Sequence, residues 1–189
     1  MKTTDEIALI KRCLQGSRDS FELLVKKYQS NIMALSVNIL GSYDDARDIV
    51  QETFVQAYVH LDRFDLQRNF KTWLLSIAAK RCLDFLRKRK SFLNYFLKHS
   101  RTLQEERIRE YKGIEDSEIF YPLLKRMKDK ERIALVLKIN EEYSAKEIAS
   151  VLDCSESTAR VHLFNAKQRL KKQLTGVKKT KKIPGEVFQ

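Results

Sequence analysis

Residues that interrupt helices are scarce along this sequence. It has 5 glycines and 2 prolines among 189 residues, which is low against average usage. Between them, apolar residues recur at the three- and four-residue spacing of an amphipathic helix. The clearest series ends before Gly41 and consists of Phe21, Leu24, Val25, Tyr28, Ile32, Leu35 and Ile39. We therefore predict an all-α protein.

Helical periodicity divides the sequence into two units. Residues 1–90 read as an N-terminal helical unit and residues 116–174 as a second one. Between them, residues 91–115 carry charge and a few aromatics but no sustained period, so we predict a linker. Residues 175–189 form a basic tail that contains Gly and Pro. The predicted architecture is two small helical domains joined by a flexible linker, the C-terminal one a helix-turn-helix.

Charge is unevenly distributed over a chain whose formal net charge is +12. Residues 42–65 hold six acids and two bases. By contrast, residues 68–101 hold ten bases and one acid, and residues 156–182 hold nine bases and one acid. An acidic segment followed by two strongly basic ones differs from an ordinary solvated surface, where the signs mix. The excess of bases predicts a polyanionic partner, either a nucleic acid or an acidic membrane surface.

Several classes of protein and site lack their signatures in this sequence. No apolar run approaches the ~20 residues that cross a bilayer, and the N-terminus has no signal-peptide core, so we expect a cytoplasmic protein. Cys13, Cys82 and Cys154 lie far apart and form no CxxC pair, so we expect reduced thiols and no metal. Neither a P-loop nor a catalytic constellation is present. We expect no cofactor and no enzymatic activity.

The segment SAKEIASVLDCSESTARVHLFNAKQRL, residues 144–170, is a candidate helix-turn-helix. Ser144 and Glu147 have the spacing of a capping box at the start of the first helix, and Ser155 or Ser157 can cap the second. The outer face of the second helix offers side chains suited to base edges and phosphates in a major groove. These are Ser157, Thr158, Arg160, Val161, His162, Asn165, Lys167 and Arg169. The alternative is a plain helical hairpin with a solvated polar face.

Three further blocks precede this segment: FELLVKKYQSNIMALSVNILG, DDARDIVQETFVQAY and FKTWLLSIAAKRCLDFLRKR. In order and spacing, the four blocks resemble the two conserved modules of the extracytoplasmic-function (ECF) sigma factors of bacterial RNA polymerase, over residues 18–90 and 116–173. The resemblance implies a non-enzymatic subunit that binds core RNA polymerase and directs promoter-specific initiation of transcription. Its partners would be the polymerase, promoter DNA and an anti-sigma protein, which in this group is often membrane-anchored.

In that family, the helix resembling residues 44–61 docks on a coiled coil in the largest polymerase subunits. Its acidic and amide face in this sequence consists of Asp45, Asp48, Gln51, Glu52 and Gln56. Such side chains can pair with cations on a partner. From the residues alone, an ordinary exposed helix face is the simpler interpretation, and the resemblance favours docking.

The resemblance also implies that residues 70–90 hold the melted strand of the proximal promoter element, while the loop at residues 65–69 captures a flipped base. The candidate base contacts are Asp65, Gln67 and Asn69, and the candidate phosphate contacts are Lys71, Lys80, Arg81, Arg87, Lys88 and Arg89. A single strand is held by such a cationic track together with a base-sized pocket. The alternative for the loop is a helix cap. The second module would bind the distal, minus-35 element as duplex.

Three other hypotheses compete with this interpretation. A stand-alone helix-turn-helix regulator explains residues 144–172 but neither the acidic face nor the cations at residues 87–90. An enzyme acting on nucleic acid lacks a catalytic constellation, and a membrane-surface protein lacks the apolar face that such helices use. The sequence also departs from the commoner family pattern at Lys80, in the recognition helix and in the tail, so the bases read are not carried over.

Overall fold

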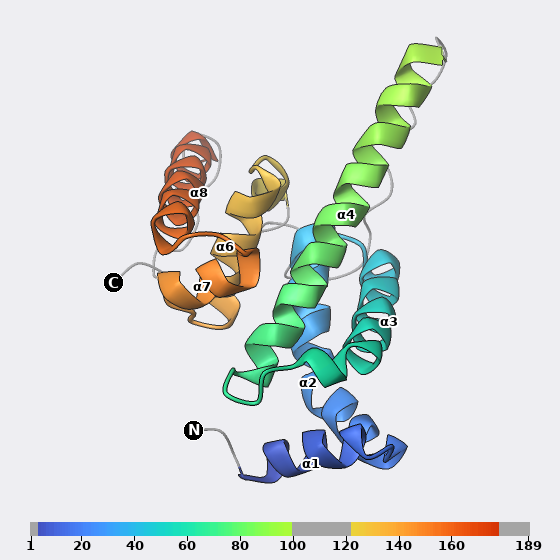
Figure 1. Ribbon diagram of the computed structural model, residues 1–189. Coiled ribbons are helices and arrows are strands. Elements are labelled where there is room, and N and C mark those ends of the chain that lie inside the picture. Colours follow the sequence, from blue (N-terminus) through green and yellow to red (C-terminus); the bar gives the residue numbers. More distant parts are fainter. Residues whose placement is uncertain (1–3, 100–121, 178–189) are drawn as a thin grey trace.

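The structure is a computed structural model that describes residues 4–99 and 122–177, and the side chains of residues 6–92 and 122–175. Every long element in these ranges is an α-helix (Figure 1). The first group is α1 (Thr4–Leu14), α2 (Arg18–Leu40), α3 (Tyr43–Val59), the 3₁₀ turn η1 (Leu61–Arg63) and α4 (Phe70–His99). The second group is α6 (Asp129–Asn140), α7 (Ala145–Leu152) and α8 (Glu156–Val177). The predicted all-α fold class is confirmed.

Short polar side chains and one glycine set the ends of the N-terminal helices. Ser17 accepts a hydrogen bond from the Ser20 amide (3.4 Å) at the start of α2, and Ser42 accepts one from the Asp45 amide (3.2 Å) at the start of α3. Between the two helices, Gly41 adopts φ 71°, a left-handed conformation that is open to glycine without steric cost. The Gly41 amide still donates back into α2. The chain therefore leaves α2 at Gly41 and turns into α3.

The central helix of the structure is α4, which packs against α2 and α3 on one side and against α6 and α7 on the other (Figure 1). Its buried stripe consists of Phe70, Leu74, Leu75, Ala78, Ala79 and Cys82. The helix continues past residue 90, where the predicted N-terminal unit ends, and runs to His99. The rest of the predicted linker, residues 100–115, lies outside the described residues, as do residues 178–189 of the predicted tail.

Helices α7 and α8 form the predicted helix-turn-helix. In the capping box, the Ser144 hydroxyl accepts from the Glu147 amide (3.3 Å) and the Glu147 carboxylate accepts from the Ser144 amide (2.8 Å). Asp153 has φ 49° and ends α7 in the left-handed region. Of the two candidate serines, Ser155 caps α8, because its hydroxyl accepts from the Thr158 amide (3.2 Å). Local polar groups thus set both ends of the turn.

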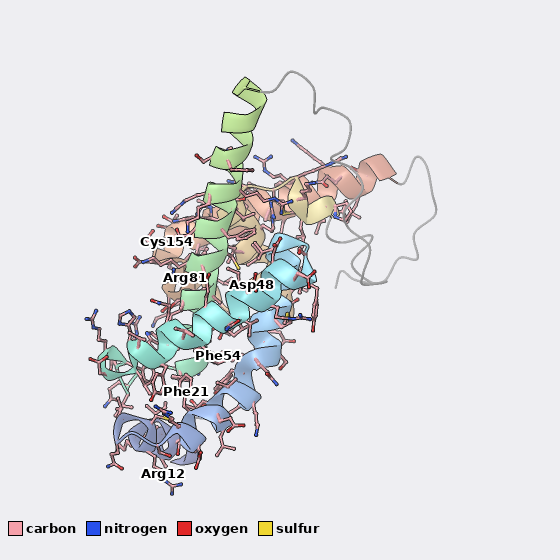
Figure 2. The ribbon with its side chains drawn as sticks, turned by 90° about the vertical axis from the view of Figure 1, so that its right-hand side faces the viewer. Arg12, Phe21, Asp48, Phe54, Arg81 and Cys154 are labelled. Carbon is pink, nitrogen blue, oxygen red and sulfur yellow. The ribbon has the colours of Figure 1, made fainter. Side chains whose placement is uncertain are left out.

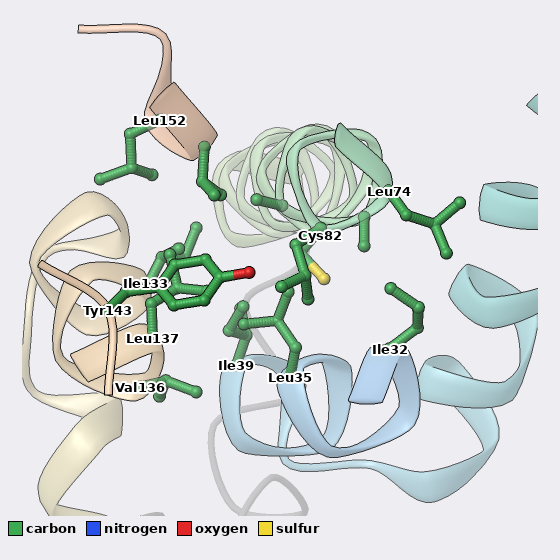
Figure 3. Close-up of a cluster of buried hydrophobic side chains, with 14 of the residues drawn as sticks. Ile32, Leu35, Ile39, Leu74, Cys82, Ile133, Val136, Leu137, Tyr143 and Leu152 are labelled. Carbon is green, nitrogen blue, oxygen red and sulfur yellow. The ribbon is translucent and has the colours of Figure 1, made fainter. Parts of the chain in front are cut away.

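The two groups of helices pack against each other. Helix α7 lies along α4, and α6 lies against α2. Figure 3 shows side chains from these four helices meeting in one cluster, together with Tyr143 from the turn before α7. The other labelled members are Ile32, Leu35, Ile39, Leu74, Cys82, Ile133, Val136, Leu137 and Leu152. Burial of apolar surface therefore stabilises the contact between the two units as well as each unit.

Candidate nucleic-acid interfaces and an acidic helix face

Helix α3 turns an acidic and amide face outward. Its inner side is buried and consists of Ala46, Ile49, Thr53, Phe54 and Ala57. On the outer side, Asp48, Gln51 and Glu52 are exposed, while Asp45 and Gln56 are partly buried. Figure 2 looks onto this outer side and labels Asp48. In Figure 1, α3 lies on the side of α4 that faces away from α6, α7 and α8, so the face is open to another protein.

Two residues predicted for different sites contact each other. Asp45 Oδ2 of α3 lies 3.8 Å from Arg89 Nη1 of α4. Both side chains are partly exposed, at 32% and 52%, so the ion pair contributes little to the free energy of unfolding. It nevertheless places one predicted phosphate contact beside one predicted polymerase contact. The ion pair has to break before the paired atoms of Asp45 or Arg89 can bind another molecule.

An apolar groove runs beside the acidic face, between α2 and α3. Figure 2 labels Phe21 of α2 and Phe54 of α3, which both line it. It is lined by Phe21, Val25, Val50, Gln51, Phe54, Val55, Tyr58 and Val59. Val55, Tyr58 and Val59 are 53%, 43% and 58% exposed, and Phe21 packs on Tyr58 with ring centroids 4.9 Å apart. This groove was not among the sites predicted from the sequence. The spacing of Val55 and Val59, one helical turn apart outside the buried stripe, is the signal that could have indicated it.

The loop before α4 is held by its own polar groups. Asp65 Oδ1 accepts from the Gln67 amide (2.8 Å), and the Asp65 carbonyl oxygen accepts from the Arg68 amide (2.9 Å). Asn69 Oδ1 accepts from the Thr72 amide (3.0 Å) and so caps α4. The cap uses only the oxygen of the Asn69 side chain, and the Gln67 side chain is exposed. Capping by Asn69 is therefore compatible with a contact from its amide nitrogen to a base.

The predicted cationic track follows α4 from its first turn to residue 90. Lys80 and Lys88 are exposed and Arg81 is partly buried. Arg87 Nη1 lies 3.2 Å from Asp84 Oδ1. An exposed ion pair of this kind contributes little free energy, so a phosphate can replace the carboxylate as the partner of Arg87. The structure thus leaves most of the predicted track accessible.

The N-terminal end of the track faces the C-terminal unit instead. Lys71 forms an ion pair with Glu141, which follows α6. Beside it, Arg68 Nη2 donates to Ser150 Oγ of α7 (3.3 Å). These contacts join residues that are far apart in the sequence, so no local pattern could indicate them. Lys71 is therefore engaged within the protein in this structure.

The predicted distal face lies on α8. Its inward residues Ala159, Ala166 and Leu170 are buried. The outer face exposes Ser157, Thr158, Arg160, Val161 and Lys167, with His162 and Asn165 partly buried. Arg160 Nη2 lies 2.6 Å from Glu156 Oε1, one turn earlier on the same helix. This exposed pair has to open before the guanidinium can bond a base, which costs little.

Two members of the predicted distal face have surroundings that affect their role. Arg169 Nε lies 2.8 Å from Oε2 of Glu131, whose side chain is 3% exposed. A buried carboxylate needs a charged or hydrogen-bonding partner, so Arg169 has a structural role that the sequence analysis did not assign. Burial, and then the charge of Lys130, lower the pKa of His162 below its ordinary value. The imidazole is therefore neutral at pH 7 and better suited to a hydrogen bond than to an ionic contact.

Phe164 is a residue that the sequence analysis missed. Its side chain is 61% exposed, and that of Val161, one turn earlier on α8, is 55% exposed. The two form an apolar strip on the outer face of the second helix of the helix-turn-helix. Apolar side chains in this position are suited to the methyl group of thymine. The signal was present in the sequence, because residue 164 falls outside the stripe that contains Ala159 and Leu170.

The helical fold, the helix-turn-helix of α7 and α8 and the exposed cations of α4 and α8 define the class of DNA-binding transcription proteins. Residues 24–92 match the family described as Sigma-70 region 2, and residues 117–170 match Sigma-70, region 4. The chain is 32% identical over 179 residues to the ECF RNA polymerase sigma factor SigW of Bacillus subtilis. The aligned region covers 87% of this chain and 94% of that protein. It is 27% identical over 183 residues to the ECF RNA polymerase sigma-E factor of Haemophilus influenzae, with coverage of 90% and 95%.

Among solved structures, the fold is similar to that of the sigma factor RpoE from Bartonella quintana, solved with the anti-sigma factor NepR. The TM-score is 0.66 at 22% identity, over 82% of this chain and 96% of that one. The chain belongs to the ECF sigma factors. It directs RNA polymerase to initiate transcription at specific promoters and, as a sigma factor, catalyses no reaction itself. The predicted function is therefore confirmed, and the alternative of a stand-alone regulator is set aside. No helix in residues 4–99 and 122–177 is long and apolar enough to cross a membrane.

Proposed function

We propose how the surfaces of this sigma factor divide the work of initiation. The outer face of α3 binds core RNA polymerase, α4 and the loop before it bind the melted proximal element, and α8 reads the distal, minus-35 element as duplex. The observation that carries this proposal is the outward acidic face of α3. It lies within the segment that matches Sigma-70 region 2, on the side of α4 away from the C-terminal unit (Figure 1).

Docking on α3 combines charge with apolar contact. Asp48 and Glu52 are one helical turn apart and exposed, so they can pair with cations that steer association and fix the register. The neighbouring groove offers Val55 and Val59, whose burial is worth about 25 cal/mol per Å² of apolar surface. A partner helix with cations beside an apolar strip meets both requirements. The polymerase coiled coil implied by the family resemblance is our proposed occupant.

Capture of the melted strand takes place at the loop before α4. Extruding a base from the stack costs a few kcal/mol, which the protein has to return through new contacts. The side chains of Gln67 and Asn69 can bond a base edge while Asn69 Oδ1 still caps the helix. Lys80 and Lys88 supply exposed cations for the phosphates. Binding free energy, rather than bond chemistry, therefore opens the DNA.

Reading of the distal element falls to the exposed face of α8. Arg160 can bond guanine once it leaves Glu156, and Asn165 can bond adenine. Val161 and Phe164 add apolar contacts to thymine methyl groups, while Lys167 contacts the backbone. The mixture of polar and apolar contacts on one helix face allows sequence-specific binding.

An anti-sigma protein is a further partner that we propose. The structurally similar RpoE of Bartonella quintana was solved with such a protein. In this chain, the acidic face of α3 and the groove beside it offer a surface that an inhibitor and the polymerase would share. We also propose that the protein works in the cytoplasm, where polymerase and promoter DNA are found.

The proposal is tested by binding to core RNA polymerase, followed by run-off transcription on genomic fragments. We expect a stable complex and initiation from a subset of promoters only when the protein is added. Promoter duplex should bind far more tightly to the complex than to the free protein. Equal affinity for a promoter with and without polymerase would overturn the proposed division of work.

A further inference from the structure

Aromatic rings pack together at the base of the loop before α4, residues 65–69. Phe64 immediately precedes this loop, and Phe70 follows it as the first residue of α4. Both are buried, and their rings meet edge to face with centroids 5.2 Å apart. Trp73, one turn into α4, packs on both rings, with its centroid 5.0 Å from that of Phe64 and 5.5 Å from that of Phe70. Aromatic contacts therefore join the two ends of the loop.

Tyr28 of α2 connects this aromatic cluster to α1. It is 7% exposed, and the centroid of its ring lies 5.8 Å from that of Phe70. The Tyr28 hydroxyl donates a hydrogen bond to Oε2 of Glu6 on α1. Nζ of Lys27 lies 2.7 Å from the same oxygen and 5.2 Å from the centroid of the Tyr28 ring. A carboxylate of the first helix thus holds the ring that contacts the first residue of α4.

Glu6 lies where a charge is costly. It is 9% exposed and lies on the side of α1 that also buries Ile10 and Cys13. A buried carboxylate needs partners to offset its desolvation, and an apolar side chain of similar volume is often at least as stabilising. The carboxylate adds direction, because a hydrogen bond from Tyr28 selects one position of the ring. Stability alone therefore does not explain why this position holds an acid.

Helix α1 supports the loop from both of its ends. It contacts η1, which leads into the loop, and through Tyr28 it reaches the residue that follows the loop. In Figure 1, α1 lies at the end of the molecule where the chain passes from η1 into α4. Acceptors on Asp65 and Asn69 set the internal shape of the loop. Its place on the protein is set by Phe64 and Phe70, which anchor its two ends.

We propose that Glu6 is a positioning residue for capture of the melted strand. It acts through Tyr28 and Phe70, which keep the loop in the position that binds a base. Without the bond between Glu6 and Tyr28, the loop takes up this position in only a fraction of the molecules. The apparent dissociation constant for the strand then rises by the inverse of that fraction. The inference rests on the proposed role of the loop in strand capture and extends that site to α1.

Two variants remove the bond from opposite sides. Glu6→Ala removes the acceptor, whereas Tyr28→Phe removes the hydroxyl and keeps the ring. Glu6→Gln keeps a side-chain oxygen that can accept from Tyr28, so this variant should behave as the unchanged chain does. The matched control is Glu22→Ala, which removes the same charge from an exposed ion pair with Lys26 on α2.

The packing of the aromatic cluster can be measured without DNA. Trp73 is the single tryptophan of the chain, and it contacts Phe64 and Phe70. Quenching of its fluorescence by acrylamide therefore reports on the cluster in the free protein. We expect a larger quenching constant in Glu6→Ala and Tyr28→Phe, and no change in Glu6→Gln or in the control. Circular dichroism and urea denaturation establish that each variant is folded.

Strand capture is measured with the polymerase complex and a promoter fragment whose proximal element is held open by mismatches. Glu6→Ala and Tyr28→Phe should weaken binding of this open fragment about fivefold, as when the loop is in place in about one molecule in five. Binding to core polymerase, and to a duplex that carries the distal element alone, should not change. The double variant should lose no more than either single one, because both changes remove the same bond.

The inference is wrong if quenching of Trp73 in the two variants equals that in Glu22→Ala. It is also wrong if binding of the open fragment falls no further than binding of polymerase or of the distal duplex, because Glu6 then has only a structural role. Gln67→Ala, at an exposed position in the loop, tests the proposed function separately. Unchanged binding of the open fragment by Gln67→Ala would refute the loop as the site of capture, whatever the fluorescence shows.

Discussion

Arg132 of α6 donates a hydrogen bond from Nη1 to the main-chain carbonyl oxygen of Ile39, across 2.5 Å, at the end of α2. The arginine is 4% exposed, and it also bonds the Lys125 carbonyl oxygen (3.4 Å). One guanidinium therefore joins the C-terminal unit to the last turn of α2, where helix carbonyl groups lack partners of their own.

Replacing this guanidinium should destabilise the protein. In Arg132→Met the side chain keeps its length, but the carbonyl of Ile39 loses its charged donor. We expect the free energy of unfolding to fall by about 2–3 kcal/mol, the worth of a buried hydrogen bond to a charged group. Urea denaturation followed by circular dichroism measures this. Arg126→Met, at an exposed position, is the control, and an equal loss there would contradict a specific role for Arg132.

The acidic face of α3 can be tested by reversing one charge. Asp48→Arg should weaken binding to core polymerase by about tenfold, a typical effect when like charges meet across an interface. Because Asp48 is exposed, the midpoint of urea denaturation should not change. Asp62→Arg on η1 makes the same change of charge away from this face. Equal affinities of the two variants, measured by biolayer interferometry, would remove α3 from the proposed interface.

Arg160 and Lys167 should differ in how they affect the reading of duplex DNA. Arg160→Ala should cost about 1–3 kcal/mol of discrimination at one or two base pairs. Lys167→Ala should weaken binding by a similar factor on every sequence and reduce its salt dependence. Competition binding of promoter variants by the polymerase complex separates these outcomes. A uniform loss in Arg160→Ala would assign that residue to the backbone.

Phe164 should contribute to DNA binding but not to folding. Since its side chain is 61% exposed, Phe164→Ala should leave the free energy of unfolding within about 0.5 kcal/mol. Binding of the distal element by the polymerase complex should weaken, and the loss should be smallest where thymine is already replaced by uracil, which lacks the methyl group that the ring would contact. Unfolding at lower urea concentration would instead mean that the ring supports the core.

The three cysteines should react at different rates. Burial raises the pKa of Cys82 to about 12, and burial also raises the pKa of Cys13, so neither forms thiolate near neutral pH. Cys154 is partly exposed and should react first with a disulfide reagent at about pH 8. Cys154→Ser should abolish the fast phase, whereas three equal rates would mean that the core is open.

The raised pKa of Cys82 also predicts the direction of a pH effect on stability. In the unfolded chain, this thiol loses its proton above its ordinary value of 9.0, while the folded thiol retains it up to about 12. The unfolded state then binds fewer protons, so stability falls as the pH rises through this range. Urea denaturation at increasing alkaline pH should show a smaller decline in Cys82→Ala than in the unchanged chain.

Local features of the fold could be predicted from the sequence because local interactions produce them. The capping box of Ser144 and Glu147 and the termination of a helix at Gly41 depend on residues a few positions apart. The faces of α3 and α8 follow from helical periodicity, which also identified Asp48 and Arg160 as outward-facing side chains. A resemblance then supplied what periodicity cannot, namely which partner each face meets.

The relation between the two units could not be predicted in the same way. The contacts of Glu141 with Lys71 and of Arg132 with Ile39 depend on how complete helices pack, and no spacing in the sequence encodes them. The role of Arg169 was missed for the same reason, because its partner Glu131 lies on another helix. Charge counting treated Lys71 and Arg169 as surface groups, although each of them pairs with a carboxylate within the protein.

The placement of α3, on the far side of α4 from the C-terminal unit, has a consequence for how partners can be combined. A protein bound to the outer face of α3 leaves α8 uncovered, because the two helices lie on opposite sides of α4. One copy of the protein can therefore hold an enzyme and a duplex at the same time.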